Sequence, residues 1–216
     1  MNTHLRLVEN AFRAGPEHQA ERAARSPDYA LLAPGSREDF KAHLLRLNTE
    51  DRRRRFCRTL GDDGVSAVVD DLDPTAPRVG AYVDGVLRGV AELYPPAGAG
   101  LTTRPAEVSL TVESAYQRRG IGTQLLKKTL KLAANRFVSD VVLISLPGNE
   151  PLKAVAARFG ARTVLEDGDL VLHINPGPIS VWTLMGEARL AARGAAKGFP
   201  VPDFAGRAVL ARRAAS

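Results

Sequence analysis

The sequence of 216 residues is 44% hydrophobic and 25% charged, which suits one domain with extensions and a full, mostly aliphatic core. A single cysteine, Cys57, excludes an internal disulfide and a cysteine-rich zinc site, and four scattered histidines indicate no metal site. Residues 1–18 hold no apolar run long enough for a signal peptide or a membrane span, so we expect a cytoplasmic protein without membrane contact.

The first third of the chain predicts an extension, a short strand and a pair of helices. Residues 1–28 are expected to form an N-terminal extension with a short helix, and residues 29–33 a strand. The two helices that follow are expected to begin at caps formed by Ser36 and Asn48. Each cap residue is followed three positions later by an aspartate, which is a helix-start pattern.

The second of these helices carries four consecutive arginines, at positions 52 to 55, followed by Phe56. Because consecutive helical residues are about 100° apart, the four arginines cannot share one face. We therefore expect a solvated helix with Phe56 and Leu60 packed inward. A further short helix is expected between residues 65 and 72, before Pro74.

The stretch from Arg78 to Tyr94 predicts a β-hairpin. Asp84-Gly85 lies between two apolar runs, and this is the strongest short sequence signal for a two-residue hairpin turn. A loop rich in proline, glycine and alanine then leads to the next strand.

The stretch from Glu107 to Leu126 predicts a strand joined to a helix by a short turn. Apolar and polar residues alternate from 107 to 113, which is typical of a strand with two unlike faces. From Ile121 to Phe137 the apolar residues recur at helical spacing. The turn between them reads Gln-Arg-Arg-Gly-Ile-Gly, at residues 117–122.

This turn is suited to binding an anion. The first backbone N–H groups of a helix have no intrahelical partners, and the helix dipole adds positive charge there. Gly120 and Gly122 would let a phosphate approach those N–H groups, and Arg118 and Arg119 could add charge-assisted bonds. The alternative is a tight turn whose glycines only relieve backbone strain.

Two nucleotide-binding motifs are excluded at this turn. A P-loop is excluded because no Gly-Lys-Ser/Thr follows, and a dinucleotide fingerprint is excluded because Leu125 occupies the position of its third glycine.

The pattern that remains, Gln117-x-x-Gly120-x-Gly122 between a strand and a long amphipathic helix, resembles the acetyl-CoA signature of the GNAT superfamily of N-acetyltransferases. With L-N-T-E-D-R-R-R-R-F ahead of the sheet, it is most similar to bacterial protein-lysine acetyltransferase domains. The resemblance covers residues 29–175. It implies an α/β (α+β) fold with a mixed, mostly antiparallel sheet of about six to seven strands and about four flanking helices.

The segment after the long helix fits the same fold. The apolar run at 141–146 predicts a strand buried on both faces. Asn149 predicts the start of a helix with Pro151 in its first turn, and Gly160 predicts its end. This segment resembles the element that closes the GNAT fold, although Ala161 stands at a usually aromatic position. A last hairpin is expected around residues 166–169.

The resemblance also implies which residues bind acetyl-CoA, the expected co-substrate. The glycine turn would bind the pyrophosphate, and backbone groups of the preceding strand would bind the pantetheine arm and polarise the thioester. The expected cofactor-binding residues are Leu110, Val112, Gln117, Arg118, Arg119, Gly120, Ile121, Gly122, Thr123 and Asn149. No metal is expected.

Acetyl transfer to an amine also needs a base, and three carboxylates are candidates. The Ala-Glu-Val stretch at Glu107 resembles the segment that carries the base glutamate of protein-lysine acetyltransferases, so we rank Glu107 first and Glu92 second. Glu113 is the poorest candidate because the neighbouring phosphate would repel it. For each of them the alternative is an ordinary strand carboxylate. No tyrosine lies at 155–157, where many GNAT enzymes place a general acid.

We therefore expect an acyltransferase that moves an acetyl group from acetyl-CoA directly to a primary amine, either a protein lysine or a small amine. The alternative is a noncatalytic acyl-CoA-binding or sensor domain on the same scaffold. A nucleic-acid partner is not favoured, because six basic and two acidic residues put +4 of the net charge of +6 into residues 176–216. This basic tail has a helical composition at 187–197, and both a homodimer contact and a solvated tail are consistent with its sequence.

Overall fold

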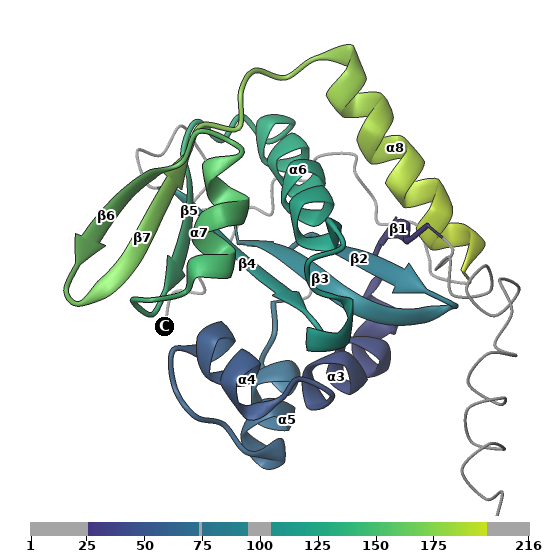
Figure 1. The fold of residues 1–216 in the computed structure, drawn as a ribbon. Helices are drawn as coiled ribbons and strands as arrows, with labels where there is room; N and C mark the ends of the chain where they lie inside the picture. The colour runs from purple at the N-terminus through teal and green to yellow at the C-terminus, as the bar shows by residue number, and fades with distance from the viewer. Residues whose placement is uncertain (1–25, 74, 95–104, 198–216) are drawn as a thin grey trace, which may run out of the picture.

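The computed structural model describes residues 26–73, 75–94 and 105–197 (Figure 1). Its centre is a seven-stranded sheet in the order β1-β2-β3-β4-β5-β7-β6. Neighbouring strands are antiparallel except for the parallel pair β4 and β5. The predicted mixed, mostly antiparallel sheet is confirmed. The helix predicted within residues 1–28, and most of the loop that follows Tyr94, lie outside the described residues.

The strands are β1 (Asp28–Leu31), β2 (Arg78–Val83), β3 (Val86–Tyr94), β4 (Ala106–Val112), β5 (Val141–Ser145), β6 (Arg162–Glu166) and β7 (Asp169–Ile174). The α-helices are α3 (Arg37–Leu45), α4 (Thr49–Phe56), α5 (Asp62–Asp70), α6 (Ile121–Ala134), α7 (Glu150–Ala157) and α8 (Val181–Ala196). The described residues thus form six α-helices, where about four were expected. Short 3₁₀ turns at Pro34–Ser36 and Ser114–Tyr116 precede α3 and the glycine turn.

Helices cover both faces of the sheet and create two cores. In Figure 1, α6, α7 and α8 lie above the sheet and α3, α4 and α5 below it. Adjacent residues at the end of β1 enter different cores. Leu31 belongs to the larger cluster with Leu125 and Leu190, whereas Leu32, just after the strand, belongs to the smaller cluster with Phe40. Burial of this segment on both sides explains why residues 29–33 form a continuous apolar run.

Local sequence signals explain most element boundaries. The turn between β2 and β3 is Asp84-Gly85, with φ of 51° and 78°, as a two-residue hairpin requires. The Asn48 side chain accepts a hydrogen bond from the Asp51 N–H at 2.7 Å, so the predicted cap of α4 is confirmed. The predicted cap of α3 is wrong in one respect. The Ser36 hydroxyl caps no backbone N–H, because a 3₁₀ turn precedes the helix and buries that side chain.

The end of α6 also departs from the expected pattern. The helix stops at Ala134, and Phe137 has φ of 57° and is 75% exposed. The prediction that Phe137 continues the apolar face is therefore wrong. The N–H of Phe137 still donates to the carbonyl of Ala134, and that of Val138 to Ala133, so the chain turns off the helix in a left-handed cap.

Helix α8 packs on the domain between β1 and α6. Leu190 and Ala191 belong to the larger core, so the first half of the segment predicted as a basic tail lies against the sheet layer. An added Cβ on Gly194 would lie 2.5 Å from the carbonyl oxygen of Leu31, so only glycine permits this approach. Glu187, near the middle of α8, also anchors the helix, accepting hydrogen bonds from Asn135 at 2.6 Å and Arg136 at 2.9 Å. None of the described helices is long and apolar enough to cross a membrane.

Candidate active site

A cavity of about 940 Å³ opens between β4, β5, α7 and α4. Its walls come from elements that are distant in sequence but converge on the ends of β4 and β5. Residues that line it include Val108 to Val112 of β4, Leu143 and Ile144 of β5, Asp51, Arg54 and Arg55 of α4, and Leu152, Val155 and Arg158 from α7 and its C-cap. Ile144 is 42% exposed, so the expectation that β5 is buried on both faces is wrong at this residue, which faces the opening.

The cavity exists because β4 and β5 separate. These strands pair only at Ala106 with Val141 and at Glu107 with Val142, although β4 continues to Val112. On the β5 side of β4, the Ala106 N–H donates to the backbone carbonyl of Asp140 at 3.0 Å. On the β3 side, the Glu113 N–H donates to the backbone carbonyl of Arg88 at 2.9 Å. Because backbone groups of a strand alternate in direction, the N–H groups of Leu110 and Val112 point into the gap. No strand among the described residues pairs with them there.

The glycine turn closes one end of this gap. Gly120, with φ of 79°, is the N-cap of α6, and the first intrahelical bond runs from the Gln124 N–H to its carbonyl at 3.0 Å. The N–H groups of Ile121, Gly122 and Thr123 therefore have no partner within the helix. A Cβ on Gly122 would meet only ordinary contacts, at 3.7 Å or more, so the space beside it belongs to the cleft.

The expected cofactor-binding residues converge here. Eight of the ten line the cavity: Leu110, Val112, Gln117, Arg118, Gly120, Gly122, Thr123 and Asn149. The side chains of the other two point elsewhere. Ile121 is 1% exposed in the larger core, and the Arg119 guanidinium lies over the Tyr116 ring at 5.3 Å. Ile121 therefore contributes only its backbone to the glycine turn.

Two of these residues also hold the site together. The Gln117 amide donates to the carbonyl of Val112 at 2.9 Å and to Asp51 at 3.3 Å, which links the turn to β4 and α4. The Asn149 side chain accepts from the Leu152 N–H at 3.3 Å and donates to Ser145 at 2.7 Å, which caps α7 and ties it to β5. Their side-chain amides thus fix the shape of the cleft.

The two ranked base candidates have opposite environments, and neither lines the cavity. Glu107 is exposed at the start of β4, where that strand still pairs with β5. Glu92 is 1% exposed and accepts from Arg55 at 2.5 Å, Arg78 at 3.1 Å, Tyr94 at 2.6 Å and Ser109 at 2.9 Å. Burial alone would raise the pKa of Glu92, but Arg55, Tyr94 and Arg78 lower it to about 2.

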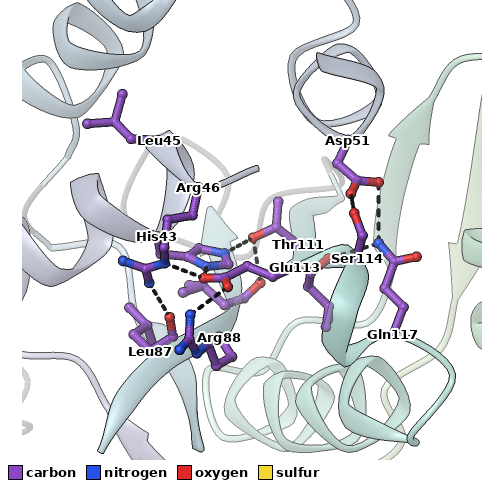
Figure 2. A network of polar contacts seen from close by, with 12 residues as sticks. His43, Leu45, Arg46, Asp51, Leu87, Arg88, Thr111, Glu113, Ser114 and Gln117 are labelled. Atoms are coloured by element: carbon purple, nitrogen blue, oxygen red, sulfur yellow. Dashed lines mark hydrogen bonds and ion pairs between the residues drawn. The ribbon is translucent and has the colours of Figure 1, made fainter. Parts of the chain in front are cut away.

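A second buried network, which the sequence did not indicate, lies beneath β4 (Figure 2). Glu113 accepts from His43 at 3.2 Å, Arg46 at 2.8 Å and Arg88 at 2.9 Å, and the other nitrogen of His43 lies 2.9 Å from the Thr111 hydroxyl. Glu113 and Thr111 are 7% and 8% exposed, because His43 of α3 covers this end of the polar face of β4. Burial would raise the pKa of Glu113, but the three donors hold it at about 2.

One signal could have located this network in the sequence. His43 lies three residues after Phe40 and next to Leu44, so it occupies the apolar face of α3. A histidine at such a position is buried and needs partners, which here come from β4. Among the described residues, no group of three or more histidine, cysteine, aspartate or glutamate side chains could hold a metal ion.

The family and structure comparisons agree with this geometry. Residues 39–161 match the Acetyltransferase (GNAT) family. No curated protein matches the chain.

Several solved structures share the fold. The GNAT domain of S. lividans PAT matches 69% of this chain and 90% of its own, with 20% identity and a TM-score of 0.58. The PaiA N-acetyltransferase of Thermoplasma acidophilum, in complex with coenzyme A, matches 70% and 99%, with 16% identity and a TM-score of 0.51. A ribosomal-protein-alanine N-acetyltransferase from Brucella melitensis matches 68% and 97%, with 17% identity and a TM-score of 0.51.

Proposed function

The chain belongs to the acetyltransferase (GNAT) family, and from that membership we propose that it transfers an acetyl group from acetyl-CoA directly to a primary amine. The observation that carries the proposal is the opening between β4 and β5, which ends at the glycine turn. An extended thioester with a diphosphate needs a long slot with unpaired N–H groups along one wall and an anion site at one end. This cleft offers both.

The backbone supplies the binding groups in this proposal. The N–H groups of Ile121, Gly122 and Thr123, at the positive end of the α6 dipole, bind the pyrophosphate, and Arg118 adds charge from the rim. The N–H groups of Leu110 and Val112 bind the pantetheine arm, and one of them polarises the thioester carbonyl as charge develops on its oxygen. Asn149 contacts the arm from the start of α7.

The acceptor enters from the side of α4. The amine nitrogen attacks the thioester carbon, a C–N bond forms, and the C–S bond breaks to release the CoA thiolate. An amine arrives mostly as ammonium, so one proton must first be removed. We assign that step to Glu107, because Glu92 already accepts four hydrogen bonds and its pKa of about 2 makes it a weak proton acceptor near neutral pH.

Glu107 is exposed and lies at the far end of β4 from the turn, so it takes the proton through water while the amine is held for attack. Acceptors in two classes fit a cleft of this size: the side chain of a lysine in a protein, and a small free amine. The walls of the acceptor side are contributed by α4, whose cavity-facing side chains are Asp51, Arg54 and Arg55.

Two measurements test the proposal. Calorimetric titration of the full chain with acetyl-CoA and with desulfo-CoA should give saturable heat in both cases. Release of free CoA thiol should then require an amine, tested with a lysine-containing peptide, free lysine and spermidine. Binding without thiol release for any of these amines would favour the noncatalytic acyl-CoA-binding alternative. Absence of binding would overturn the proposal.

A further inference from the structure

Three side chains beneath β4 form a continuous chain of hydrogen bonds that reaches the cleft (Figure 2). The Glu113 carboxylate lies 3.2 Å from Nδ1 of His43, and Nε2 of His43 lies 2.9 Å from the Thr111 hydroxyl. His43 is 0% exposed. Thr111 is among the residues that line the cavity, although His43 and Glu113 are not.

The charge of Glu113 fixes the direction of these bonds. With its pKa held at about 2, Glu113 is ionised near neutral pH and can only accept hydrogen bonds. The proton shared with Glu113 is therefore on Nδ1 of His43. In neutral imidazole the other nitrogen, Nε2, is then an acceptor, and the Thr111 hydroxyl donates to it. The other partner of this hydroxyl is the Val90 carbonyl at 3.5 Å, a much weaker contact.

His43 is poised to take a proton in this arrangement. Burial lowers the pKa of His43, and the hydrogen bond and charge of Glu113 partly offset this effect, so the ring is neutral near pH 7. The charged groups that act on the ring are the carboxylates of Glu113 and Glu92 and the guanidinium of Arg46, while Arg88 neutralises Glu113 from β3. An imidazolium formed here would be stabilised directly by the carboxylate on its Nδ1 side.

Thr111 belongs to the part of β4 that lines the cleft. It lies on β4 between Leu110 and Val112, the residues whose N–H groups face the gap between β4 and β5. After the amine attacks, its nitrogen carries a proton that must leave, and the sulfur of the departing thiolate must gain one. The chain has no tyrosine at positions 155–157 to supply that second proton.

We propose that Thr111, His43 and Glu113 shuttle a proton from the acceptor nitrogen to the sulfur of CoA, an inference that rests on the proposed function. Thr111 Oγ1 accepts the proton from the tetrahedral intermediate as its own hydroxyl proton passes to Nε2 of His43. When the C–S bond breaks, the same path runs in reverse, and Thr111 donates to the thiolate. One proton leaves the nitrogen and one reaches the sulfur, so Thr111 and His43 return to their starting protonation states. Thr111 is the catalytic residue, while His43 and Glu113 act through it as positioning residues.

The first test compares three threonine variants in single-turnover acetyl transfer. Thr111→Val removes the hydroxyl at nearly constant shape, Thr111→Ser keeps it, and Thr163→Val makes the same exchange on the exposed strand β6, outside the cleft. We expect Thr111→Val to slow the chemical step about 10²-fold or more, while Thr111→Ser stays within a few-fold of the unchanged chain. Thr163→Val should leave the rate unchanged. All three should bind acetyl-CoA normally.

The second test addresses His43. Glutamine at this position can still accept the Thr111 hydrogen bond but cannot hold an extra proton. We expect His43→Gln to lose as much rate as Thr111→Val, and the double variant to lose no more than either single one. The rate of the unchanged chain should fall as pH drops through the pKa of His43, below 6.5, and that acid limb should be absent in His43→Gln.

The outcomes separate the shuttle from the proposed function. If the unchanged chain binds acetyl-CoA but acetylates no amine, the proposed function fails and the shuttle with it. If the unchanged chain is active and Thr111→Val retains full single-turnover rate, only the shuttle is overturned. Should His43→Gln not fold, as thermal unfolding would reveal, the Thr111→Val and Thr111→Ser pair still decides.

Discussion

Arg55 of α4 and Glu92 of β3 form a buried ion pair, with 2.5 Å between Nη2 and Oε1. Arg78 completes the arrangement on the other oxygen at 3.1 Å. Removing one partner of such a pair leaves an uncompensated buried charge, which costs about 3–5 kcal/mol. The pair also fixes Arg55 in the wall of the cleft.

We therefore predict that Glu92→Gln lowers stability by several kcal/mol, measured as the free energy of unfolding in urea. The exposed carboxylate of Glu166 on β6 provides the control, and Glu166→Gln should change stability by less than about 0.5 kcal/mol. If Glu92 were instead the base, Glu92→Gln would abolish turnover while the unfolding midpoint stayed in place.

Glu107→Gln should show the opposite behaviour. The side chain is exposed, so the melting temperature should not change. If Glu107 removes the proton from the ammonium acceptor, turnover at pH 7 should fall by about 10²–10⁴-fold. Raising the pH should partly restore the rate, because more of the amine is already neutral. Unchanged turnover at pH 7 would remove Glu107 from the mechanism.

Gly122 allows a graded test of the cleft. An added Cβ would lie 3.7 Å from Leu110 and 3.8 Å from Val112 and Val155, which is ordinary packing. Gly122→Ala should therefore fold normally and weaken acetyl-CoA binding only modestly. Gly122→Leu should also fold, because leucine is a good helix former, but its side chain would fill the cleft. We expect calorimetry to detect no acetyl-CoA binding to this variant. Equal affinity in both variants would place the pyrophosphate elsewhere.

Acid should destabilise the fold in two stages. Burial lowers the pKa of His43 from 6.5, and the pKa values of Glu92 and Glu113 are lowered from 4.5 to about 2. In each case the group has the higher pKa in the unfolded chain, so the unfolded chain takes up the proton first as pH falls. The free energy of unfolding therefore rises with pH between the folded and the unfolded pKa of each group. The free energy of unfolding should begin to fall below pH 6.5 and fall further between pH 4.5 and 2. A constant unfolding midpoint from pH 7 to 4 would contradict this.

Two leucines of α8 test whether this helix belongs to the domain. Leu190 is 5% exposed within the larger core, and Leu184 on the same helix is 49% exposed. Leu190→Ala should cost about 2–5 kcal/mol, because it leaves a cavity between α8 and the sheet. Leu184→Ala should cost less than about 1 kcal/mol. Thermal unfolding of both variants would measure the difference, and similar losses would mean that α8 does not hold the domain together.

The elements that the sequence predicted well are those that local chemistry determines. The Asp84-Gly85 turn needs positive φ at both residues, and the Asn48 cap needs a backbone donor three residues away, so each signal is complete within a few positions. The glycine turn was found for the same reason. Its two glycines, the preceding strand and the following helix are contiguous in the chain.

The features that the sequence did not predict depend on partners far along the chain. Alternation correctly placed Thr111 and the following Glu113 on one side of the chain, but it could not show that α3 covers this end of the polar face, since His43 lies about 70 positions earlier. The same holds for Glu92, whose partners on α4 and β2 turn a candidate base into a buried ion pair. The role of Gly194 also required the position of Leu31, at the other end of the chain.

The short β4–β5 ladder has a mechanical consequence. Only two residue pairs connect strands β1–β4 to strands β5–β7, fewer than join any other two neighbouring strands of the sheet. The β4–β5 pairing is therefore the weakest in the sheet. A ligand that forms hydrogen bonds with both β4 and β5 would replace the hydrogen bonds that are missing between these strands. Saturation with acetyl-CoA should therefore slow amide hydrogen exchange on β5 and β7 as well as at the turn, and make the two halves melt as one.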